Sequence, residues 1–554
     1  MCPAGNRTKL VDAANNETDW TYSPTNLPLT ETNSLGTTTT TYNLDHAVSS
    51  IQDADGRLRD FVYSNDQQLT AENWMQGSTV VDTMAYTYDL AGDLTGASDG
   101  NSAYAFAYNG DAQVSSLDNA GTPNVPHVVL AKGYDLAGNM TSQSATINGT
   151  ADFANSYAYN ADQALTMVQQ QGVNGGDVVS PKEFDYGYNA IGQFTGMADY
   201  NFIGDGPRLD TLAGTFSYDT GARLTSIDYT SEGGQNAIDS YAWAYNAGNL
   251  VTSFSTSTGA ADYAYDPTNQ LTSATYSGTN QPANESYSFD ANGNRNMPGW
   301  STTADNIVSS DGTYNYQHDA DGNITVRTRI SNDYASDYRT TNTYDYRNRL
   351  TDVEYYDNNG VLTKHVHYVF DVFDNLIGEE DDDTGDGTYD NVEWYAVDAS
   401  PTAPSAGQPP AQGGLPLLQF GSSGAVTERN LVGLNPAGVD AIMAQEAVTS
   451  ENQGGAVTWM SDDNLGSDRK VVDNNGNVVD TIAYNAFGQT ASNSNPSATP
   501  WTGFAGGHDS TSTSLTLNDE RAYNPATGGW TTKDPTGFTA GDANTGRYSG
   551  NSPT

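Results

Sequence analysis

The sequence contains little cysteine and few basic residues. Cys2 is the single cysteine among 554 residues, so neither a disulfide framework nor a cysteine-ligated zinc site can form within the chain. Lysine and arginine number 21 against 68 aspartates and glutamates, which gives a formal net charge of -47. Such a negative field repels nucleic acids and anionic membranes. We therefore expect no nucleic-acid partner and interpret the charge as a source of solubility, with calcium binding as the alternative.

The sequence also lacks long apolar segments. No apolar run approaches the length of a membrane span, and the first residues, MCPAGNRTKLVDAANN, contain no apolar signal-peptide core. Hydrophobic residues make up only 36% of the chain, whereas glycine numbers 56 and tyrosine 35. That composition favours many short strands and turns over helices.

A short phrase of the type Tyr-Asp-x-x-Gly-x-Leu-Thr recurs along the chain. It reads TYDLAGDLT up to Thr95 and GYDLAGNMT up to Thr141. The residue before the Asp or Asn falls at Tyr88, Tyr108, Tyr134, Tyr159, Tyr188, Tyr218, Tyr245, Tyr265, Phe289, His318, Tyr344 and Phe370. Successive copies lie 20 to 30 residues apart, which indicates a repeat architecture.

Each copy of the phrase predicts a β-hairpin. The alternation in Met84–Tyr88 is typical of a strand with its aromatic residues on one face. Asp89 then opens a tight turn, Gly92 closes it, and Leu94 begins the return strand. Because a single hairpin is marginal in water, consecutive hairpins are expected to pair into a long antiparallel sheet that strand twist curls into a spiral.

The repeated phrase resembles the YD repeat of the RHS family, the bacterial rearrangement-hotspot proteins related to teneurins and to the toxin-complex cocoon subunits. The stretch DNLGSDRKVVDNNGNVVDTIAYNAFGQT (463–490), which includes Tyr484, is similar to the RHS repeat-associated core, with Asn464 where His is usual. The segments WTGFAGGHD, RAYNPATGGWTTKDPTGF and GRYSGNSPT follow in the family's order. The resemblance implies an all-β fold, a spiral of antiparallel hairpins that forms a hollow shell closed by the core.

The resemblance also implies a function. In the family, the shell encloses a C-terminal polymorphic domain that is often a toxin. We therefore expect a non-catalytic structural shell that encapsulates or presents a C-terminal cargo polypeptide at the cell surface or outside the cell. We expect the cargo to lie outside this chain, and PAGNRTKLVD resembles a YD unit without its first strand. Our interpretation is a secreted or surface protein cut at both ends.

Three segments are expected along the chain. Residues 1–377 carry the YD-repeat array, and residues 457–554 carry the RHS repeat-associated core. Between them, residues 378–456 combine an acidic turn with the Pro- and Gly-rich stretch DASPTAPSAGQPPAQGG, which favours an insertion or linker. A short helix is predicted over residues 437–446.

Asp534, in the segment KDPTG, is the candidate catalytic residue. In RHS proteins that cleave themselves, the resemblance implies that this Asp and a second one roughly twenty residues further on act as an aspartic-protease pair. The second Asp would fall beyond Thr554, and Asp542 does not match its position. We therefore expect Asp534 to cap the turn before Pro535, and we keep an aspartic autoprotease that releases a downstream domain as the alternative function.

The acidic segment DDTGDGTYDNVE (382–393) has the spacing of an EF-hand calcium loop. The candidate ligands at loop positions 1, 3, 5, 9 and 12 are Asp382, Thr384, Asp386, Asp390 and Glu393, with Gly387 at position 6. The flanking sequence predicts no helices. Calcium is thus the candidate cofactor, and the alternative is a solvated acidic turn between two strands.

Two other patterns are weaker. Residues 96–100 match the Gly-x-Ser-x-Gly pattern of a nucleophile elbow. Ser98, however, follows a YD turn instead of a strand that leads into a helix, so we expect a loop. His365 and His367 alternate on one strand face and lack an evident third metal ligand, so we expect strand packing.

The repeated tyrosines allow two interpretations. Their fixed place in every hairpin favours the inner wall of the shell, where rings pack across strands. The alternative is an exposed aromatic surface that stacks on sugars. In that case the chain would be an extracellular adhesion or carbohydrate-binding protein with glycans as partners.

Overall fold

The computed structural model describes residues 5–201, 210–231, 233–331, 336–401, 414–449, 454–518 and 521–554. These residues form 44 β-strands and five short 3-10 turns, and no α-helix occurs among them. None of their helical turns is long and apolar enough to cross a membrane. The predicted all-β fold of antiparallel hairpins is confirmed.

The first 24 strands pair in sequence order into one antiparallel sheet. Its strands are β1 (Lys9–Val11), β2 (Glu17–Tyr22), β3 (Pro28–Thr32), β4 (Thr37–Tyr42), β5 (Val48–Gln52), β6 (Leu58–Tyr63), β7 (Leu69–Gln76), β8 (Thr79–Tyr88), β9 (Leu94–Ser98), β10 (Ala103–Tyr108), β11 (Val114–Asp118), β12 (Val128–Tyr134), β13 (Met140–Ile147), β14 (Thr150–Tyr159), β15 (Leu165–Gly172), β16 (Lys182–Tyr188), β17 (Phe194–Tyr200), β18 (Leu212–Tyr218), β19 (Leu224–Ser231), β20 (Asn236–Tyr245), β21 (Val251–Thr256), β22 (Gly259–Tyr265), β23 (Leu271–Gly278) and β24 (Glu285–Ser286).

The next 16 strands form a second antiparallel sheet, again in sequence order. They are β25 (Trp300–Thr302), β26 (Val308–Asp311), β27 (Tyr314–His318), β28 (Ile324–Arg329), β29 (Arg339–Tyr344), β30 (Leu350–Tyr356), β31 (Leu362–Phe370), β32 (Leu376–Asp382), β33 (Asn391–Val397), β34 (Pro416–Gly421), β35 (Val426–Leu434), β36 (Asp440–Ala447), β37 (Ala456–Asp462), β38 (Asp468–Asp473), β39 (Val478–Tyr484) and β40 (Thr490–Asn493).

The C-terminal residues form a small four-stranded sheet. It contains β41 (His508–Ser510), β42 (Leu515–Asn518), β43 (Arg521–Asn524) and β44 (Gly529–Trp530). The 3-10 turns are η1 (Ala304–Asn306), η2 (Pro496–Ala498), η3 (Phe504–Gly506), η4 (Gly537–Ala540) and η5 (Ser549–Asn551).

The YD turns share one hydrogen-bonding scheme, which the turn between β8 and β9 illustrates. The N–H of Asp89 donates to the carbonyl of Asp93 at 3.0 Å, and the N–H of Gly92 donates to the carbonyl of Asp89 at 3.2 Å. Oδ1 of Asp89 accepts bonds from the N–H groups of Ala91 and Asp93 at 2.8 and 3.0 Å. Gly92 has a φ of 97°, a conformation that glycine adopts without strain. The predicted roles of Asp89 and Gly92 are thus present.

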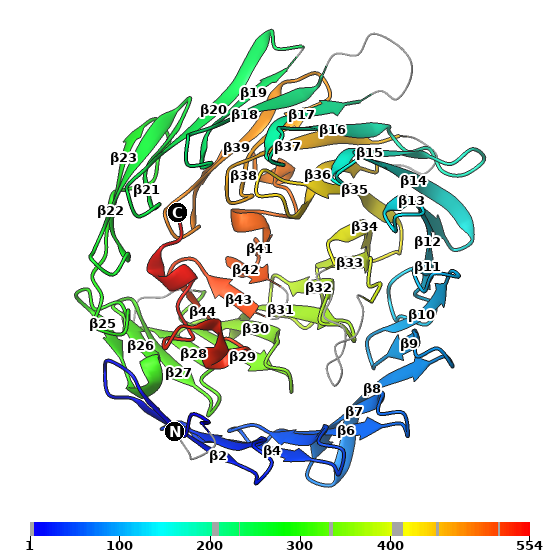
Figure 1. The fold of residues 1–554 in the computed structure, drawn as a ribbon. Coiled ribbons are helices and arrows are strands. Elements are labelled where there is room, and N and C mark those ends of the chain that lie inside the picture. The colour runs from blue at the N-terminus through cyan, green and yellow to red at the C-terminus, as the bar shows by residue number, and fades with distance from the viewer. Residues whose placement is uncertain are drawn as a thin grey trace.

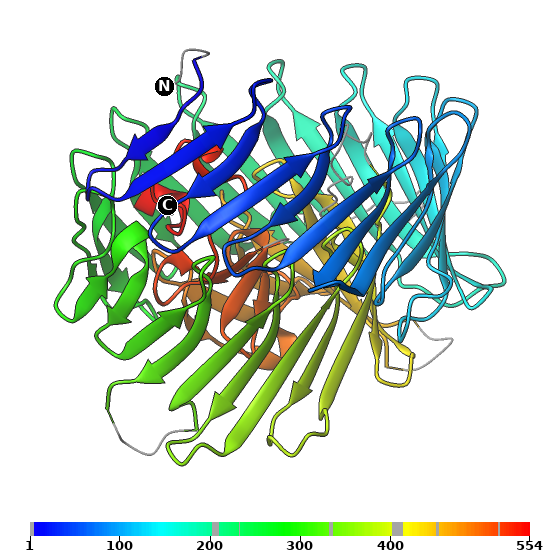
Figure 2. The same cartoon turned by 90° about the horizontal axis from the view of Figure 1, so that it is seen from below.

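The two large sheets wind as a spiral around a central region. Figure 1 shows the first sheet along the ring, the strands β33 to β39 inside the arc of β10 to β21, and the strands β41 to β44 within the ring. Figure 2 shows the early strands of the two sheets as two tiers. Several ion pairs between the sheets join residues 264 to 277 positions apart, as in Arg57–Asp321 and Arg429–Asp152. One turn of the spiral therefore takes about this length of chain.

The hydrophobic core lies between the two sheets where they pack face to face. Phe184 of β16 is buried with Leu431 of β35, and its ring centroid lies 5.4 Å from that of Trp459 in β37. Each sheet has an apolar face that water would otherwise cover, so stacking one turn of the spiral on the other removes both faces from solvent.

Two parts of segment 378–456 differ from the sequence-based expectation. The predicted helix over residues 437–446 is wrong, because Asn435 opens a YD-type turn and β36 follows it, paired with β35 and β37. Strand pairing overrides the helix propensity of AIMAQEA. The strands β33 to β36 continue the second sheet through the segment that we expected to be an insertion or linker, and the Pro-rich stretch at 402–413 lies outside the described residues.

Candidate functional site

Most of the repeated tyrosines lie in the first sheet, where their hydroxyls link neighbouring hairpins. Tyr88 is half-buried and shares its face with Met84 and Tyr86, which are buried. Its hydroxyl donates to the carbonyl of Leu69, the residue that begins the return strand of the preceding hairpin, at 2.9 Å. A hydrogen bond of this kind, repeated from hairpin to hairpin, fixes the spacing of the units around the ring.

The same bond recurs at most of the predicted positions. The hydroxyls of Tyr108, Tyr134, Tyr159, Tyr188, Tyr245, Tyr265 and Tyr344 donate to the carbonyls of Leu94, Val114, Met140, Leu165, Leu224, Val251 and Ile324 at 2.6 to 2.9 Å. Tyr218 occupies the equivalent position without such a bond to any described residue. Tyr484 is buried in the C-terminal core, 5.8 Å from the ring of Phe504.

Asp534 lies between β44 and η4, where it caps a turn. Its Oδ1 accepts a bond from the N–H of Thr536 at 2.9 Å, and its Oδ2 lies 3.1 Å from Nη1 of Arg521. Burial acts to raise the pKa of Asp534, but these partners outweigh it and hold the pKa below its ordinary value.

Asp542 forms a separate ion pair. Its Oδ2 lies 2.6 Å from Nε of Arg547. In the part of the chain that the structure describes, no hydrogen bond joins the carboxyls of Asp534 and Asp542, so these two groups do not share a proton as an aspartic-protease pair would. The surroundings of Asp534 are those of a turn cap.

The acidic segment that follows β32 forms a tight turn around Asp382. The carboxylate of Asp382 is buried and accepts backbone N–H bonds from four following residues. These are Thr384, Gly385 and Asp386 on Oδ1, at 3.1, 2.7 and 3.2 Å, and Gly387 on Oδ2, at 2.7 Å. Asp382 therefore has its oxygens occupied by the backbone.

Of the other candidate calcium ligands, Thr384 contacts Asp382, since its hydroxyl donates to Oδ1 at 3.3 Å. Glu393 pairs opposite Glu379 across β32 and β33, and it therefore lies on the opposite face of the sheet from Asp382. Oδ2 of Asp390 accepts the N–H of Asp383 at 3.0 Å. Among the described residues, no group of three or more His, Cys, Asp or Glu side chains is placed to hold a metal ion. Calcium binding by this segment stays a prediction.

His365 and His367 of β31 both contact Asp352 of β30. Nε2 of His365 and Nδ1 of His367 lie 3.0 and 2.9 Å from Oδ1 of Asp352. The bond to Asp352 raises the pKa of His367. Burial acts to raise the pKa of Asp352, but the two histidines outweigh it and bring this pKa to about 2. The three side chains form a charge cluster on the strand face.

Ser98 lies at the end of β9. It pairs with Ala85 of β8 and Ala103 of β10. A nucleophile elbow needs a sharp turn from a strand into a helix, whereas Ser98 is held between two strands.

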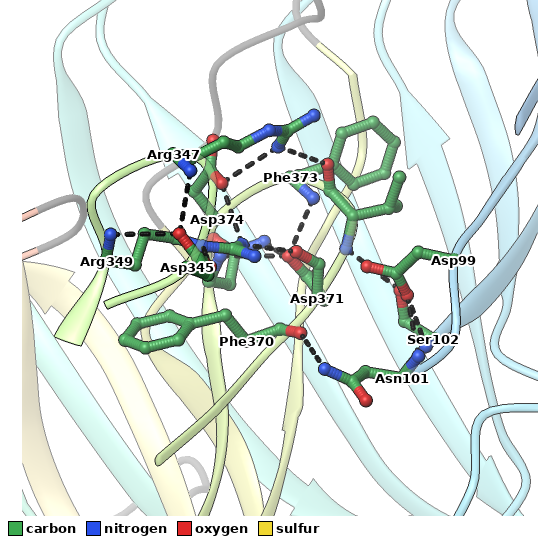
Figure 3. Close-up of polar contacts among 12 residues, drawn as sticks. Asp99, Asn101, Ser102, Asp345, Arg347, Arg349, Phe370, Asp371, Phe373 and Asp374 are labelled. Atoms are coloured by element: carbon green, nitrogen blue, oxygen red, sulfur yellow. Dashed lines mark hydrogen bonds and ion pairs between the residues drawn. The ribbon is translucent and has the colours of Figure 1, made fainter. Parts of the chain in front are cut away.

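A polar seam that was not predicted from the sequence lies between the YD turns of β29 to β32 and the first sheet (Figure 3). Nη2 of Arg347 lies 2.9 Å from Oε2 of Glu72 in β7, and Nη1 lies 2.9 Å from Oδ1 of Asp374. Arg349 contacts the same oxygen of Asp374 at 2.8 Å and pairs with Asp345 at 2.6 Å. Burial acts to raise the pKa of Glu72, but Arg347 outweighs it and brings this pKa to about 2.

The seam continues into the turn between β31 and β32. Oδ2 of Asp371 accepts a bond from the hydroxyl of Tyr104 at 2.9 Å, and the N–H of Val372 donates to Oγ of Ser102 at 2.9 Å. Burial raises the pKa of Asp371 to about 6. The sequence signal for this seam is the turn DYRNR, which places two of the 21 basic residues in one short turn.

A cavity of about 360 Å³ lies between β20 to β23 and the C-terminal core. Its lining combines aromatic, charged and amide side chains, among them Trp243, Tyr263, Tyr484 and Arg469. Thr554 also lines it, and Oγ1 of Thr554 lies 2.6 Å from the hydroxyl of Tyr265. The last residues of the chain thus lie against an aromatic cavity at the inner face of the first sheet.

Comparisons with known proteins find similar shells. The family model Teneurin YD-shell matches residues 448–548. The crystal structures of TcdB2-TccC3-TEV and TcdB2-TccC3-Cdc42 each match with a TM-score of 0.72 and 16% identity, over 97% of this chain and 28% of theirs. The crystal structure of TcdB2-TccC3 without hypervariable C-terminal region matches over the same shares with a TM-score of 0.64 and 16% identity. A comparison with curated proteins gives no match.

The likeness to these structures concerns the fold, and the chain spans about 28% of their length. The family match covers most of the predicted core segment 457–554, and the structural matches cover the repeat array as well. With its YD repeats and its spiral of hairpins, the chain has the fold of a YD-repeat shell, and its residues 448–548 are similar to the Teneurin YD-shell family.

Proposed function

We propose that the chain is the structural shell of a secreted or cell-surface protein, and that it encloses a cargo polypeptide joined to its C-terminal side. The observation that carries the proposal is the place of the C-terminal residues. The strands β41 to β44 lie within the ring of the first sheet (Figure 1), and Thr554 contacts Tyr265 of β22. A polypeptide joined at this point starts beside the inner face of the wall.

The construction of the wall supports the same role. Where the second sheet packs inside the first, the wall is two sheets thick and has an apolar core, so a protease or water cannot pass between its strands. One similar solved structure is described as TcdB2-TccC3 without its hypervariable C-terminal region. A toxin is the cargo class that we propose on the family resemblance.

Protease protection tests the enclosure. A short, unstructured reporter peptide with several trypsin sites is fused after Thr554, and the same peptide is fused before Met1 as the matched control. We expect the C-terminal reporter to survive at protease concentrations that remove the N-terminal one. Equal digestion of both reporters would show that the ring does not enclose a polypeptide joined to Thr554, and the proposal of an enclosed cargo would fail.

A glycan-binding role is the second candidate. The cavity near Thr554 places Trp243, Tyr263 and Tyr276 beside the amide of Gln281, and rings with amides are a common lining for sugars. Titration of the protein with a panel of oligosaccharides, monitored by tryptophan fluorescence, tests this role. Loss of a sugar-induced change in Trp243→Phe supports it, and a panel without any change contradicts it.

A further inference from the structure

Lys533 differs from the other five lysines of the chain in its lack of a direct partner. Each of those five places Nζ 2.5 to 2.9 Å from a carboxylate oxygen: Lys9, Lys132, Lys182, Lys364 and Lys470 pair with Glu17, Asp398, Glu446, Asp383 and Asp239. No hydrogen bond or ion pair joins Nζ of Lys533 to a residue that the structure describes. A direct carboxylate partner holds an amine in its charged form, and Lys533 lacks this partner.

The side chain of Lys533 borders open space between β44 and η4. Two cavities, of about 160 and 190 Å³, both have Lys533 in their lining, together with Glu31 of β3 and Asp534. Lys533 is only partly buried, and its unbonded Nζ keeps accessible surface. A small molecule in these cavities can therefore reach the amine.

Apolar groups lie beside the carbon that carries this amine. Gly322 has a φ of 90°, and a Cβ at this position would lie 2.8 Å from Cε of Lys533. The same point lies 3.1 and 3.3 Å from the Cδ1 methyl groups of Ile307 and Leu35. The end of the lysine stem is thus shielded from water on this side, which disfavours the charged form of the amine.

Burial and nearby carboxylates act on Lys533 in opposite directions. Burial is the larger effect and lowers the pKa of Lys533 below its ordinary value, although four carboxylates attract its charge from a distance. One of the four has a closer cation, since Oδ2 of Asp321 lies 2.7 Å from Nη2 of Arg57. The attracting residues are Asp305, Asp321, Glu31 and Asp319.

The linings of the two cavities also carry amide and hydroxyl side chains. Asn33 and Thr38 line both cavities, Asn323 and Asn348 line the smaller one, and Asn306 lines the larger one. Amides and hydroxyls form hydrogen bonds with the hydroxyls of a ligand. Both cavities are smaller than the sites of about 300 Å³ or more that take drug-sized ligands. They therefore favour a small molecule that carries hydroxyl groups.

We propose that Lys533 is a covalent binding site for small hydroxyaldehydes, which it holds as an imine. The lone pair of the neutral amine attacks the carbonyl carbon, and one proton moves from the nitrogen to the oxygen, which gives a carbinolamine. The nitrogen then expels the hydroxyl group, which leaves as water with the second proton of the amine. A C=N bond remains, and the step needs no oxidant or reductant. The proposal goes beyond the shell function and does not depend on an enclosed cargo.

Reductive trapping on the whole chain tests the site. Glyceraldehyde is added with cyanoborohydride, which reduces an imine to a stable secondary amine, and peptide mass mapping gives the labelling rate of each lysine. We expect Lys533 to be labelled about tenfold faster than Lys9, because a difference of one pKa unit changes the fraction of neutral amine about tenfold. Lys9 is the internal control, since its bond to Glu17 raises its pKa on an exposed surface.

Two comparisons show whether the cavities cause the difference. In urea the cavities are lost, so Lys533 and Lys9 should be labelled at equal rates. Butanal lacks the hydroxyl groups of glyceraldehyde, so the ratio of the Lys533 rate to the Lys9 rate should be lower with butanal. Equal rates in the folded chain, a difference that persists in urea, or an equal ratio for the two aldehydes overturns the proposal.

A pair of variants identifies the reacting group. Lys533→Arg keeps the positive charge but cannot form an imine, so the fast adduct should disappear. Lys364→Arg is the matched control and should leave the fast adduct unchanged, since Lys364 is paired with Asp383 at 2.9 Å. A fast adduct that remains in Lys533→Arg overturns the proposal. The rates of Lys533 and Lys9 in the unmodified chain decide it even where a variant does not fold.

Discussion

Nζ of Lys182 in β16 lies 2.6 Å from Oε2 of Glu446 in β36, and both side chains are fully buried although 264 residues separate them. Oε1 of Glu446 also accepts the N–H groups of Ser180 and Gly455 at 3.0 and 2.9 Å. Burial acts to raise the pKa of Glu446, but Lys182 and these amides outweigh it and lower it. The pair joins the two turns of the spiral where their sheets pack face to face.

Lys182→Met is therefore expected to destabilise the fold by about 3–5 kcal/mol, because it removes the cation that pairs directly with the buried carboxylate of Glu446 and leaves only Arg429, at 3.7 Å, beside it. Urea denaturation measures the change. The double variant Lys182→Met with Glu446→Gln is the control, and it should recover part of the loss because it removes both charges and keeps an oxygen for the N–H groups of Ser180 and Gly455. A single variant as stable as the parent protein would show that the pair does not hold the two turns together.

The tyrosine hydroxyls offer a second test. Tyr88→Phe removes only the bond to the carbonyl of Leu69, and we expect it to lower the free energy of unfolding by about 1 kcal/mol. Tyr218→Phe is the matched control, because Tyr218 takes the same place in its hairpin without such a bond to a described residue. Equal effects of the two substitutions in denaturant titrations would contradict a role for the hydroxyl.

The local part of the fold could be predicted because its causes are local. Asp89 and Gly92 shape a turn within five residues, and the position of Tyr88 follows from strand alternation. The contact of Lys182 with Glu446 could not be predicted, because it depends on how one spiral turn stacks on another. The helix predicted over residues 437–446 is wrong, because pairing with two neighbouring strands overrides the helix propensity of these residues.

Among the candidate sites, too, the features that depend on neighbouring residues could be predicted, and those that depend on distant segments could not. The cap around Asp534 follows from its own neighbours, and the sequence analysis expected it. The sequence of the acidic segment is compatible with a calcium loop and with a hairpin turn. The strand pairing of Glu393 with Glu379 shows that Glu393 and Asp382 lie on opposite faces of the sheet, and this pairing is not evident from the sequence.

Apolar side chains in the YD turns of the two sheets have opposite surroundings. Phe373 of the second sheet is buried, with its ring centroid 5.9 Å from that of Tyr104 and 6.1 Å from that of Phe106. Leu136, in a turn of the first sheet, is fully exposed. The difference arises because the turn of Phe373 docks on the first sheet.

Phe373→Ala is therefore expected to cost about 3–5 kcal/mol of stability, through lost burial and a cavity. Leu136→Ala should change stability by no more than about 0.5 kcal/mol, because the side chain is already in water. Thermal unfolding of both variants measures the contrast. A small effect of Phe373→Ala would show that the docked turn contributes little to holding the two sheets together.

The histidine cluster predicts a dependence of stability on pH. His367 has a pKa raised above 6.5 by Asp352, so its contribution to stability is complete below pH 6.5 and is lost as the pH rises through the raised pKa. Asp352 has a pKa lowered from 3.8 to about 2, so its contribution is complete above pH 3.8 and is lost as the pH falls toward 2. Glu380 pairs opposite His367 and adds to its charged form.

Between these limits, at about pH 4 to 6.5, the cluster should stabilise the fold most. His367→Gln is expected to lower the melting temperature in this window and to have less effect at pH 9, with a maximum loss of about 1 kcal/mol because the cluster is partly exposed. His127→Gln is the control, since His127 pairs with Asp118 at 2.9 Å on a more exposed surface. A loss from His367→Gln that is the same at pH 5 and pH 9 would show that the charge of His367 does not stabilise the strand face.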